Sequence, residues 1–223
     1  MDLNIDGAWP MRDLATQQQQ VYQTLREQLI AGRFKPGTGV SLRGIASSLD
    51  VGLMPVREAI NRLAGERALE VRRNGRVSVP DLTRQRFEEL MQARLQLEPP
   101  CARWALPHLD ADRLARMEAS DASMNSNYGL GNADAYMLEN YRFHFELYRA
   151  GGSQVFVPLL ESVWMQFGPF MRSVYDMSET PTIVDKHKMA LEAIRRRDQD
   201  ALDVAIRADI LDAMHLLRQT LAY

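Results

Sequence analysis

The chain has 223 residues and a formal net charge of −2, which allows two small domains and excludes a wholly basic nucleic-acid coat or an acidic tail protein. Its single cysteine, Cys101, excludes an intrachain disulfide and fits a reducing compartment. No stretch approaches the roughly 20 apolar residues of a membrane span and the N-terminus lacks signal-peptide features, so we expect a cytoplasmic protein with no membrane partner.

The charge is unevenly distributed along the chain. Residues 21–79 hold ten Lys or Arg against five acids, a formal +5 that leaves −7 for the remainder. This asymmetry predicts two parts with different partners. We place them at residues 1–80 and 81–223.

The first part reads as three short helices and a hairpin. A loose arm over residues 1–14 precedes a helix that ends at Gly32, and a second helix fits Ser41 to Leu49 with Ser41 as N-cap. A third begins near Pro55, a residue favoured in the first turn. The dipeptide Asn74-Gly75, between alternating apolar residues, then predicts a two-residue hairpin turn.

This order of elements is the layout of a winged helix-turn-helix, whose third helix lies in the DNA major groove. Arg72, Arg73 and Arg76 surround the expected hairpin tip, from which they can reach phosphates or a minor groove. A charged turn that only confers solubility has the same composition. The hairpin alone does not decide between these two interpretations.

The neighbouring residues favour DNA. Residues 32–79 resemble the DNA-binding domain of the GntR family of bacterial transcription regulators, above all in the Pro-Val-Arg-Glu-Ala string at 55–59. The matching residues are Gly32, Pro36, Gly37, Ala46, Val51, Pro55, Val56, Arg57, Glu58, Ala59, Leu63 and Gly75. The resemblance implies a double-stranded DNA operator as partner. We expect it to be contacted by Arg43, Arg57, Asn61, Arg72, Arg73, Gly75 and Arg76.

Three positions depart from the family pattern. Gly52-Leu53-Met54 stands where Ser-Arg-Thr is usual, which removes polar groups that typically touch DNA. This change implies fewer contacts that recognise bases, or an unusual target sequence. Asp50 occupies the usual glycine of the turn, a position that tends to need positive φ, which Asp tolerates better than most residues. Arg67 also stands where glycine is common.

From residue 81 the sequence is helical and acidic. Its periodicity predicts an antiparallel bundle of six helices, at about 82–105, 109–127, 133–150, 153–176, 181–197 and 199–221. Breaks are expected at Pro99-Pro100, Pro107, Gly129 to Gly131, Gly151-Gly152 and Pro181. The predicted fold class is therefore mainly α, with an N-terminal winged helix-turn-helix and a C-terminal six-helix antiparallel bundle.

Two sets of polar residues fall on apolar faces of this bundle. Arg94 and Glu98, at i and i+4, either bridge each other or leave Arg94 pointing into an anion-binding cavity. Asn140 and His144 have the same spacing, which suits two metal ligands. With a turn near Asp198, His187 and Asp209 would lie side by side and complete a metal site. Alternatively, His144 is a core histidine and His187 a surface residue.

The same segments resemble the FCD ligand-binding domain of FadR-type GntR regulators, in the sets Glu89, Arg94 and Glu98; Asn140, Phe143, His144, Ala150 and Gly151; and His187, Leu191, Ala193, Ile194 and Asp198. The resemblance implies a divalent metal (Zn, Ni or Mn) held by Asn140, His144, His187 and Asp209. Asp209 stands where a third histidine is expected. A small carboxylate effector is then expected near Arg94, Glu98 and Tyr141.

The combined expectation is a homodimeric, sequence-specific transcription regulator, with repression as the commoner family arrangement and an organic acid as effector. It is not expected to be an enzyme. One alternative is an all-helical metalloenzyme with a basic appendage, although no catalytic triad or glycine-rich phosphate loop is apparent. Another is a regulator-like protein with degenerate DNA specificity.

Overall fold

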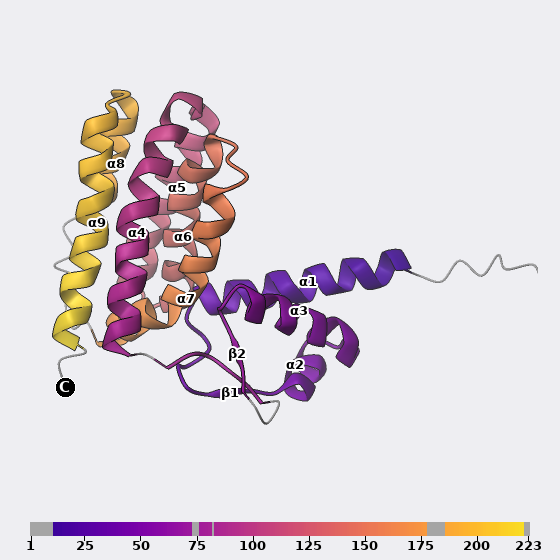
Figure 1. Cartoon of the computed structure of the whole chain (residues 1–223). Coiled ribbons are helices and arrows are strands. Elements are labelled where there is room, and N and C mark those ends of the chain that lie inside the picture. Colours follow the sequence, from indigo (N-terminus) through magenta and orange to yellow (C-terminus); the bar gives the residue numbers. More distant parts are fainter. Residues whose placement is uncertain (1–10, 73–75, 82, 178–185, 221–223) are drawn as a thin grey trace, which may run out of the picture.

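The computed structural model describes residues 11–72, 76–81, 83–177 and 186–220. Figure 1 shows an upright helical body from which α1 projects sideways, with the smaller helices and strands gathered beneath α1. The N-terminal part contains α1 (Met11–Ile30), β1 (Gly39–Val40), α2 (Leu42–Ser48), α3 (Leu53–Gly65), β2 (Glu70–Val71) and β3 (Val77–Ser78). The body contains α4 (Arg84–Ala105), a 3-10 turn (Leu106–His108), α5 (Ala111–Gly129), α6 (Ala133–Ala150), α7 (Phe156–Met177), α8 (Lys186–Arg195) and α9 (Gln199–Thr220).

The N-terminal part is a winged helix-turn-helix, as the sequence predicts. The Ser41 side chain caps α2 by accepting a hydrogen bond from the Gly44 N–H at 3.1 Å. Asp50 adopts φ 50° in the turn between α2 and α3, and Arg67 adopts φ 60° after α3. Both positions therefore have the left-handed backbone for which glycine is usual, and the expectation for Asp50 is confirmed.

The wing is a three-stranded sheet in the order β1-β3-β2, with β3 antiparallel to both neighbours. Val77 of the central strand is paired on both sides, with Val40 of β1 and with Val71 of β2. The Asn74-Gly75 turn lies outside the described residues. At its base the Arg72 N–H donates to the Arg76 carbonyl at 2.7 Å, which closes the described end of the hairpin.

Two expectations about helix limits are wrong. Residues 11–14 belong to α1 rather than to a loose arm, because no Gly or Pro interrupts residues 11–30. The Pro99-Pro100 pair does not break α4, which runs on to Ala105. Pro99 has no N–H to give to the Leu95 carbonyl, and Arg207 Nη1 of α9 donates to that carbonyl instead, at 3.2 Å.

The body is the six-helix bundle expected, formed within the described ranges by α4 to α9. The breaks at Pro107, Gly129 to Gly131 and Gly151-Gly152 coincide with the ends of α-helices as predicted: Pro107 lies in the 3-10 turn after α4, and Gly129 is the last residue of α5. Pro181 lies outside the described residues. The largest fully buried side chains of the body are Phe87, Met91, Phe143, Phe145, Tyr148, Phe167 and Phe170. None of the described helices has the length and apolar character that a bilayer crossing requires.

The two parts share a contact between α1 and α7. Gly168 of α7 packs on the carbonyls of Leu29 and Ile30, so closely that a Cβ would lie 2.2 Å from the Leu29 oxygen. Ser162 of α7 donates to the Glu66 carbonyl, just after α3, at 2.7 Å. The end of α1 and the end of α3 are thereby joined to one helix of the body.

Candidate nucleic-acid interface and metal centre

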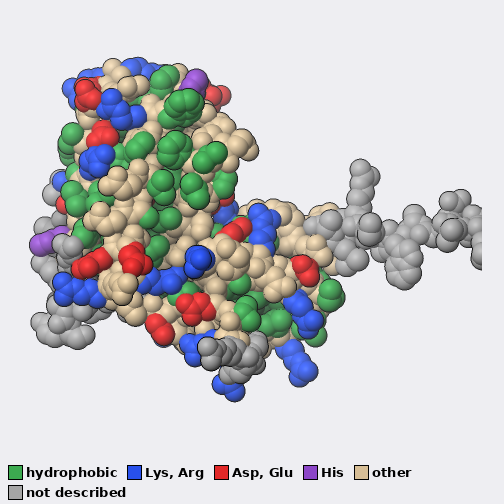
Figure 2. Space-filling view, in the orientation of Figure 1, with side chains coloured by type: hydrophobic (Ala, Val, Ile, Leu, Met, Phe, Trp, Pro, Cys, Tyr) green, Lys and Arg blue, Asp and Glu red, His purple; other side chains and the backbone are tan. Residues whose placement is uncertain are grey.

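The outward face of α2 and α3 carries the cations expected to touch DNA. Arg43, Arg57 and Asn61 are all exposed. Neither Arg43 nor Arg57 forms an ion pair with any residue that the structure describes. Figure 2 shows Lys and Arg side chains projecting from the underside of this part of the molecule. Unpaired, exposed guanidinium groups on a recognition helix are available to phosphates or to base edges.

The next arginine along α3 is arranged differently. Arg62 stacks on the Tyr22 ring, with its guanidinium carbon 3.6 Å from the ring centroid, and its Nε donates to Glu66 at 3.2 Å. Burial, the hydrogen bond to Glu66 and the charge of Glu66 raise the pKa of Tyr22 to about 12. Arg62 therefore helps to pack α3 on α1, while Arg57 stays available.

The wing residues are only partly described. Arg72 Nε donates to Ser78 Oγ at 3.0 Å, which holds the exposed Arg72 along the hairpin. Arg76 is exposed as well. Arg73 and Gly75 lie outside the described residues, so their proposed role at the tip remains a prediction.

Three helices of the body bring potential metal ligands together. His144 of α6, His187 of α8 and Asp209 of α9 each offer one ligand atom, and these atoms lie within 4.8 Å of one another. His144 Nε2 is 3.3 Å from Asp209 Oδ2, and His187 Nε2 is 3.7 Å from Asp209 Oδ1. His187 and Asp209 thus lie side by side, as the geometry of the last two helices predicts. Asn140 is buried one turn before His144 on the same face of α6.

The electrostatics of this cluster suit a cation. Burial alone raises the pKa of Asp209, but His144, His187 and Arg94 outweigh it and hold that pKa well below its usual range. Asp209 is therefore a carboxylate at neutral pH. His144 Nε2 is buried and faces the Asp209 carboxylate at 3.3 Å without meeting the geometry of a hydrogen bond, and a metal ion between the two atoms would satisfy both.

Asp121 of α5 is a further polar residue beside His187 that the sequence did not predict. Its Oδ1 lies 3.5 Å from His187 Nδ1, on the side of the ring away from the nitrogen that faces Asp209. A carboxylate on the second ring nitrogen fixes the tautomer and orientation of a ligating histidine. One sequence feature could have identified Asp121 as functional: it is an acidic residue on the face of α5 that is buried, with Met117, Ser120 and Met124.

The Arg94–Glu98 pair is a buried ion pair, so the first of the two alternatives holds. Arg94 Nε donates to Glu98 Oε1 at 2.5 Å, and Tyr148 Oη and Trp164 Nε1 donate to the same carboxylate at 2.6 Å and 3.0 Å. Burial lowers the pKa of Arg94, but Glu98 outweighs this effect and the pKa is raised. The Tyr148 hydroxyl is also 3.2 Å from His144 Nδ1, which links the pair to the metal-ligand cluster.

Tyr141, the third residue expected to bind the effector, has different partners from Arg94 and Glu98. Its hydroxyl accepts hydrogen bonds from Arg149 Nη2, at 2.7 Å, and from Arg26 of α1. Arg26 and Arg149 both pair with Glu161 of α7, at 2.9 Å and 2.6 Å. Among the described residues, Tyr141 makes no hydrogen bond to the Arg94–Glu98 pair, with which it was grouped, and instead belongs to the junction between α1 and the body.

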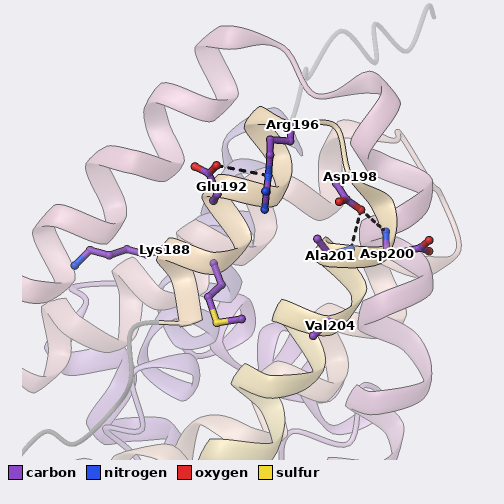
Figure 3. Close-up of a pocket in the computed structure, with 8 residues that line it drawn as sticks. Lys188, Glu192, Arg196, Asp198, Asp200, Ala201 and Val204 are labelled. Carbon is purple, nitrogen blue, oxygen red and sulfur yellow. Dashed lines mark hydrogen bonds and ion pairs between the residues drawn. The ribbon is translucent and has the colours of Figure 1, made fainter.

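A surface groove of about 690 Å³ lies on the outer face of α8 and α9. Figure 3 shows Arg196 facing Glu192 and Asp198 facing the first residues of α9. Arg196 Nε is 3.5 Å from Glu192, and Asp198 Oδ1 accepts from the N–H groups of Asp200 and Ala201 at the start of α9. None of the residues expected to bind DNA, metal or effector lines this groove.

Comparison with protein families gives two matches. Residues 17–79 match the model described as "Bacterial regulatory proteins, gntR family". Residues 89–212 match the FCD domain model. The two matches together span both the winged helix and the helical body.

Similar curated proteins are transcription regulators by name. The HTH-type transcriptional regulator McbR of Escherichia coli is 24% identical over 184 residues, covering 81% of this chain and 83% of McbR. The gluconate operon transcriptional repressor of Bacillus subtilis is 26% identical, over 78% of this chain and 74% of that protein. The HTH-type transcriptional repressor GlaR of Escherichia coli is 23% identical over 90% and 96%.

Solved structures show the same fold. The structure of E. coli McbR/YncC superposes with a TM-score of 0.85 at 22% identity, covering 92% of this chain and 98% of that one. A putative GntR regulator from Rhodococcus sp. RHA1 gives 0.72 at 22% identity with the same coverage. The arrangement of winged helix and bundle is therefore shared with these proteins.

Proposed function

Since the chain belongs to the gntR family of bacterial regulatory proteins and contains an FCD domain, we propose that it is a transcriptional repressor that binds operator DNA through its winged helix. The observation that carries this proposal is the pair Arg43 and Arg57, exposed on two successive helices without ion pairs among the described residues. The names of similar proteins include three operon or transcriptional repressors. A protein that binds an operator would act in the cytoplasm.

The operator is proposed to be bound by a homodimer. A single winged helix makes contacts on one face of one half-site, and two half-sites about one helical turn apart multiply a modest affinity. In each half-site Arg57 is suited to bidentate pairing with guanine O6 and N7, while Arg43 and the wing arginines hold phosphates. This division assigns base reading to α3 and positioning to α2 and the wing.

The helical body is proposed to hold a divalent metal ion and a small carboxylate. His144, His187 and Asp209 would hold the metal, with Asn140 as a further ligand. Two imidazole nitrogens with carboxylate and amide oxygens suit Zn, Ni or Mn. The bound metal would offer an open position to the carboxylate of an organic acid. The buried His144 Nε2 beside the ionised Asp209 supports this assignment.

The connection from this site to DNA is proposed to run through α6. Asn140 and Tyr141 are consecutive on α6. Asn140 is buried one turn before the cluster residue His144, and Tyr141 accepts hydrogen bonds at the α1 junction. A shift of α6 on effector binding would move the acceptor of the Arg26 hydrogen bond, and with it α1 and the DNA-contacting helices. Couplings of this kind typically amount to about 1–3 kcal/mol.

The DNA-binding proposal is tested with the full-length protein and a pool of 30-base-pair duplexes of random central sequence. We expect selection to yield a preferred duplex, and we expect Arg57→Ala to abolish the preference while affinity for random DNA persists. Arg196→Ala, an exposed arginine of the body, is the matched control and should bind as the wild type does. Operator affinity unchanged by Arg57→Ala would remove Arg57 from the site.

The same experiment separates the alternatives. A metalloenzyme with a basic appendage, which family membership does not favour, would yield no preferred duplex and little binding at physiological salt. A regulator with degenerate specificity would show salt-dependent binding without preference. The effector is then sought by thermal shift with a panel of organic acids, with and without added Zn²⁺. A hit should weaken binding to the selected duplex.

A further inference from the structure

Two large apolar side chains stand exposed at the start of the recognition helix. Leu53 and Met54 are the first residues of α3, and 44% and 58% of their surfaces are accessible to solvent. The core of the N-terminal part is complete without them, because α3 buries Pro55, Val56, Ala59, Ile60 and Leu63. Exposure of two neighbouring apolar side chains has no packing benefit in the chain itself.

Leu53 and Met54 share their helical face with the proposed DNA contacts. Arg57 is four residues after Leu53 and three after Met54, and Asn61 follows one turn later, so the exposed side of α3 carries all four in sequence. The guanidinium of Arg57 forms no ion pair with any described residue. The apolar pair is therefore continuous with a cationic surface complementary to DNA.

We infer that Leu53 and Met54 read the C5-methyl groups of thymine in the major groove, so that the operator carries A·T pairs where they dock. This inference rests on the proposed function. In helix-turn-helix proteins the N-terminal residues of the recognition helix contact base edges. The methyl group of thymine is the apolar group that the base pairs present there, and apolar side chains contact it. Leu53 and Met54 lack the donors that guanine recognition requires.

The test removes the methyl groups alone. The duplex selected by the full-length protein is resynthesised with deoxyuridine in place of thymine, one position at a time, which keeps base pairing and deletes only the C5-methyl. We expect about four-fold weaker binding at one or two positions in each half-site, the loss that corresponds to one methyl group no longer buried. The slope of affinity against salt should not change, because the phosphate contacts remain.

Variants assign the effect to the two residues. Leu53→Ala combined with Met54→Ala should bind the thymine and deoxyuridine duplexes equally, and far-UV circular dichroism should show an intact fold because both side chains are exposed. Leu130→Ala, which truncates an exposed leucine at the end of α5, is the control and should keep the wild-type discrimination.

The outcomes distinguish this inference from the proposed function. Wild-type binding insensitive to deoxyuridine at every position, or full discrimination in the double variant, overturns the thymine assignment and leaves operator binding intact. A selected duplex with only G·C pairs opposite the start of α3 overturns it too. Failure to select any duplex overturns the proposed function and this inference together.

Discussion

Gly168 of α7 lies directly against the backbone carbonyl of Leu29 at the end of α1. A Cβ at this position would lie 2.2 Å from the Leu29 oxygen and 2.6 Å from the Ile30 oxygen, distances at which backbone must move. We therefore expect Gly168→Ala to lower the free energy of unfolding by about 1–3 kcal/mol, the usual cost of overpacking. Urea denaturation measures the change.

The control for this substitution is Gly129→Ala, at the end of α5. Apart from its chain neighbours and the backbone of α5 itself, no described atom lies within 4 Å of a Cβ built there. Alanine is favoured over glycine in a helix by about 1 kcal/mol, so this variant should be as stable as the wild type or slightly more stable. Equal stability of the two variants would contradict the close packing of α7 on α1.

Asp121→Asn should weaken metal binding without abolishing it. Asp121 faces His187 Nδ1 at 3.5 Å, and loss of such a supporting carboxylate typically costs 10- to 100-fold in metal affinity. Competition with a chromophoric chelator measures the dissociation constant for Zn²⁺. Asp112→Asn, an exposed acid on the same helix, is the control, and a wild-type affinity in Asp121→Asn would show that the carboxylate does not support the site.

His144→Ala should remove the metal altogether. His144 contributes a buried nitrogen 3.3 Å from the Asp209 carboxylate. Its loss leaves one imidazole, that of His187, beside the oxygen donors of Asn140 and Asp209, a set that we expect to hold the ion too weakly to survive dialysis. Metal analysis after dialysis is the measurement, with His215→Ala, an exposed histidine of α9, as control. One metal ion per chain retained in His144→Ala is the result that contradicts the assignment.

Cys101 should be inert in the folded protein. Burial raises the pKa of the Cys101 thiol to about 12, with a further contribution from the charge of Glu98. At pH 8 only about one thiol in ten thousand is then a thiolate, the reactive form. A chromogenic disulfide reagent should react with one thiol per chain in 6 M urea and with none on the same time scale in buffer. Rapid labelling in buffer would contradict the burial of α4 at this position.

Asp134 makes the stability of the junction depend on pH. Burial raises the pKa of Asp134, but hydrogen bonds from Arg172 and Arg33 outweigh it and lower the pKa. The resulting stabilisation is present above the unfolded pKa of about 4 and is lost as the pH falls through the lower folded value. Asp134→Asn should thus lower the free energy of unfolding by about 0.5–1 kcal/mol at pH 7.

The difference between Asp134→Asn and the wild type should shrink as the pH falls below about 4. Unfolding curves recorded between pH 7 and pH 2 give the profile, and Asp112→Asn, which removes one negative charge from an exposed position on α5, controls for net charge. A difference that stays constant over this range would contradict the lowered pKa.

The sequence predicted those structural features that depend on residues close together in the chain. Capping chemistry at Ser41 predicted the start of its helix, and apolar periodicity predicted the approximate ranges of the body helices. The left-handed backbone at Asp50 was expected from the family resemblance, because glycine is usual at that position. The pairing of His187 with Asp209 was predictable because both lie at equal distances from one short turn. Each of these inferences uses one short continuous stretch of the chain.

What the sequence did not predict depends on residues far apart in the chain. Asp121 reaches the ligand cluster only because α5 packs beside α8, and Tyr141 meets Arg26 across a separation of 115 residues. The apolar periodicity of one helix carries no information about contacts between residues so far apart in the chain. The choice between an ion pair and an anion site at Arg94 was likewise settled by Tyr148 and Trp164, which arrive from α6 and α7.

The hydrogen bond from Arg207 to the Leu95 carbonyl has a consequence for how the body is completed during synthesis. Its two partners are 112 residues apart, so α4 leaves the ribosome long before the donor that replaces the missing Pro99 N–H. Until α9 docks, water must solvate that carbonyl, and the first helix of the body cannot be sealed from solvent at this point. A chain truncated before Arg207 therefore loses most of α9. It also loses the hydrogen-bond donor that the Leu95 carbonyl of α4 requires.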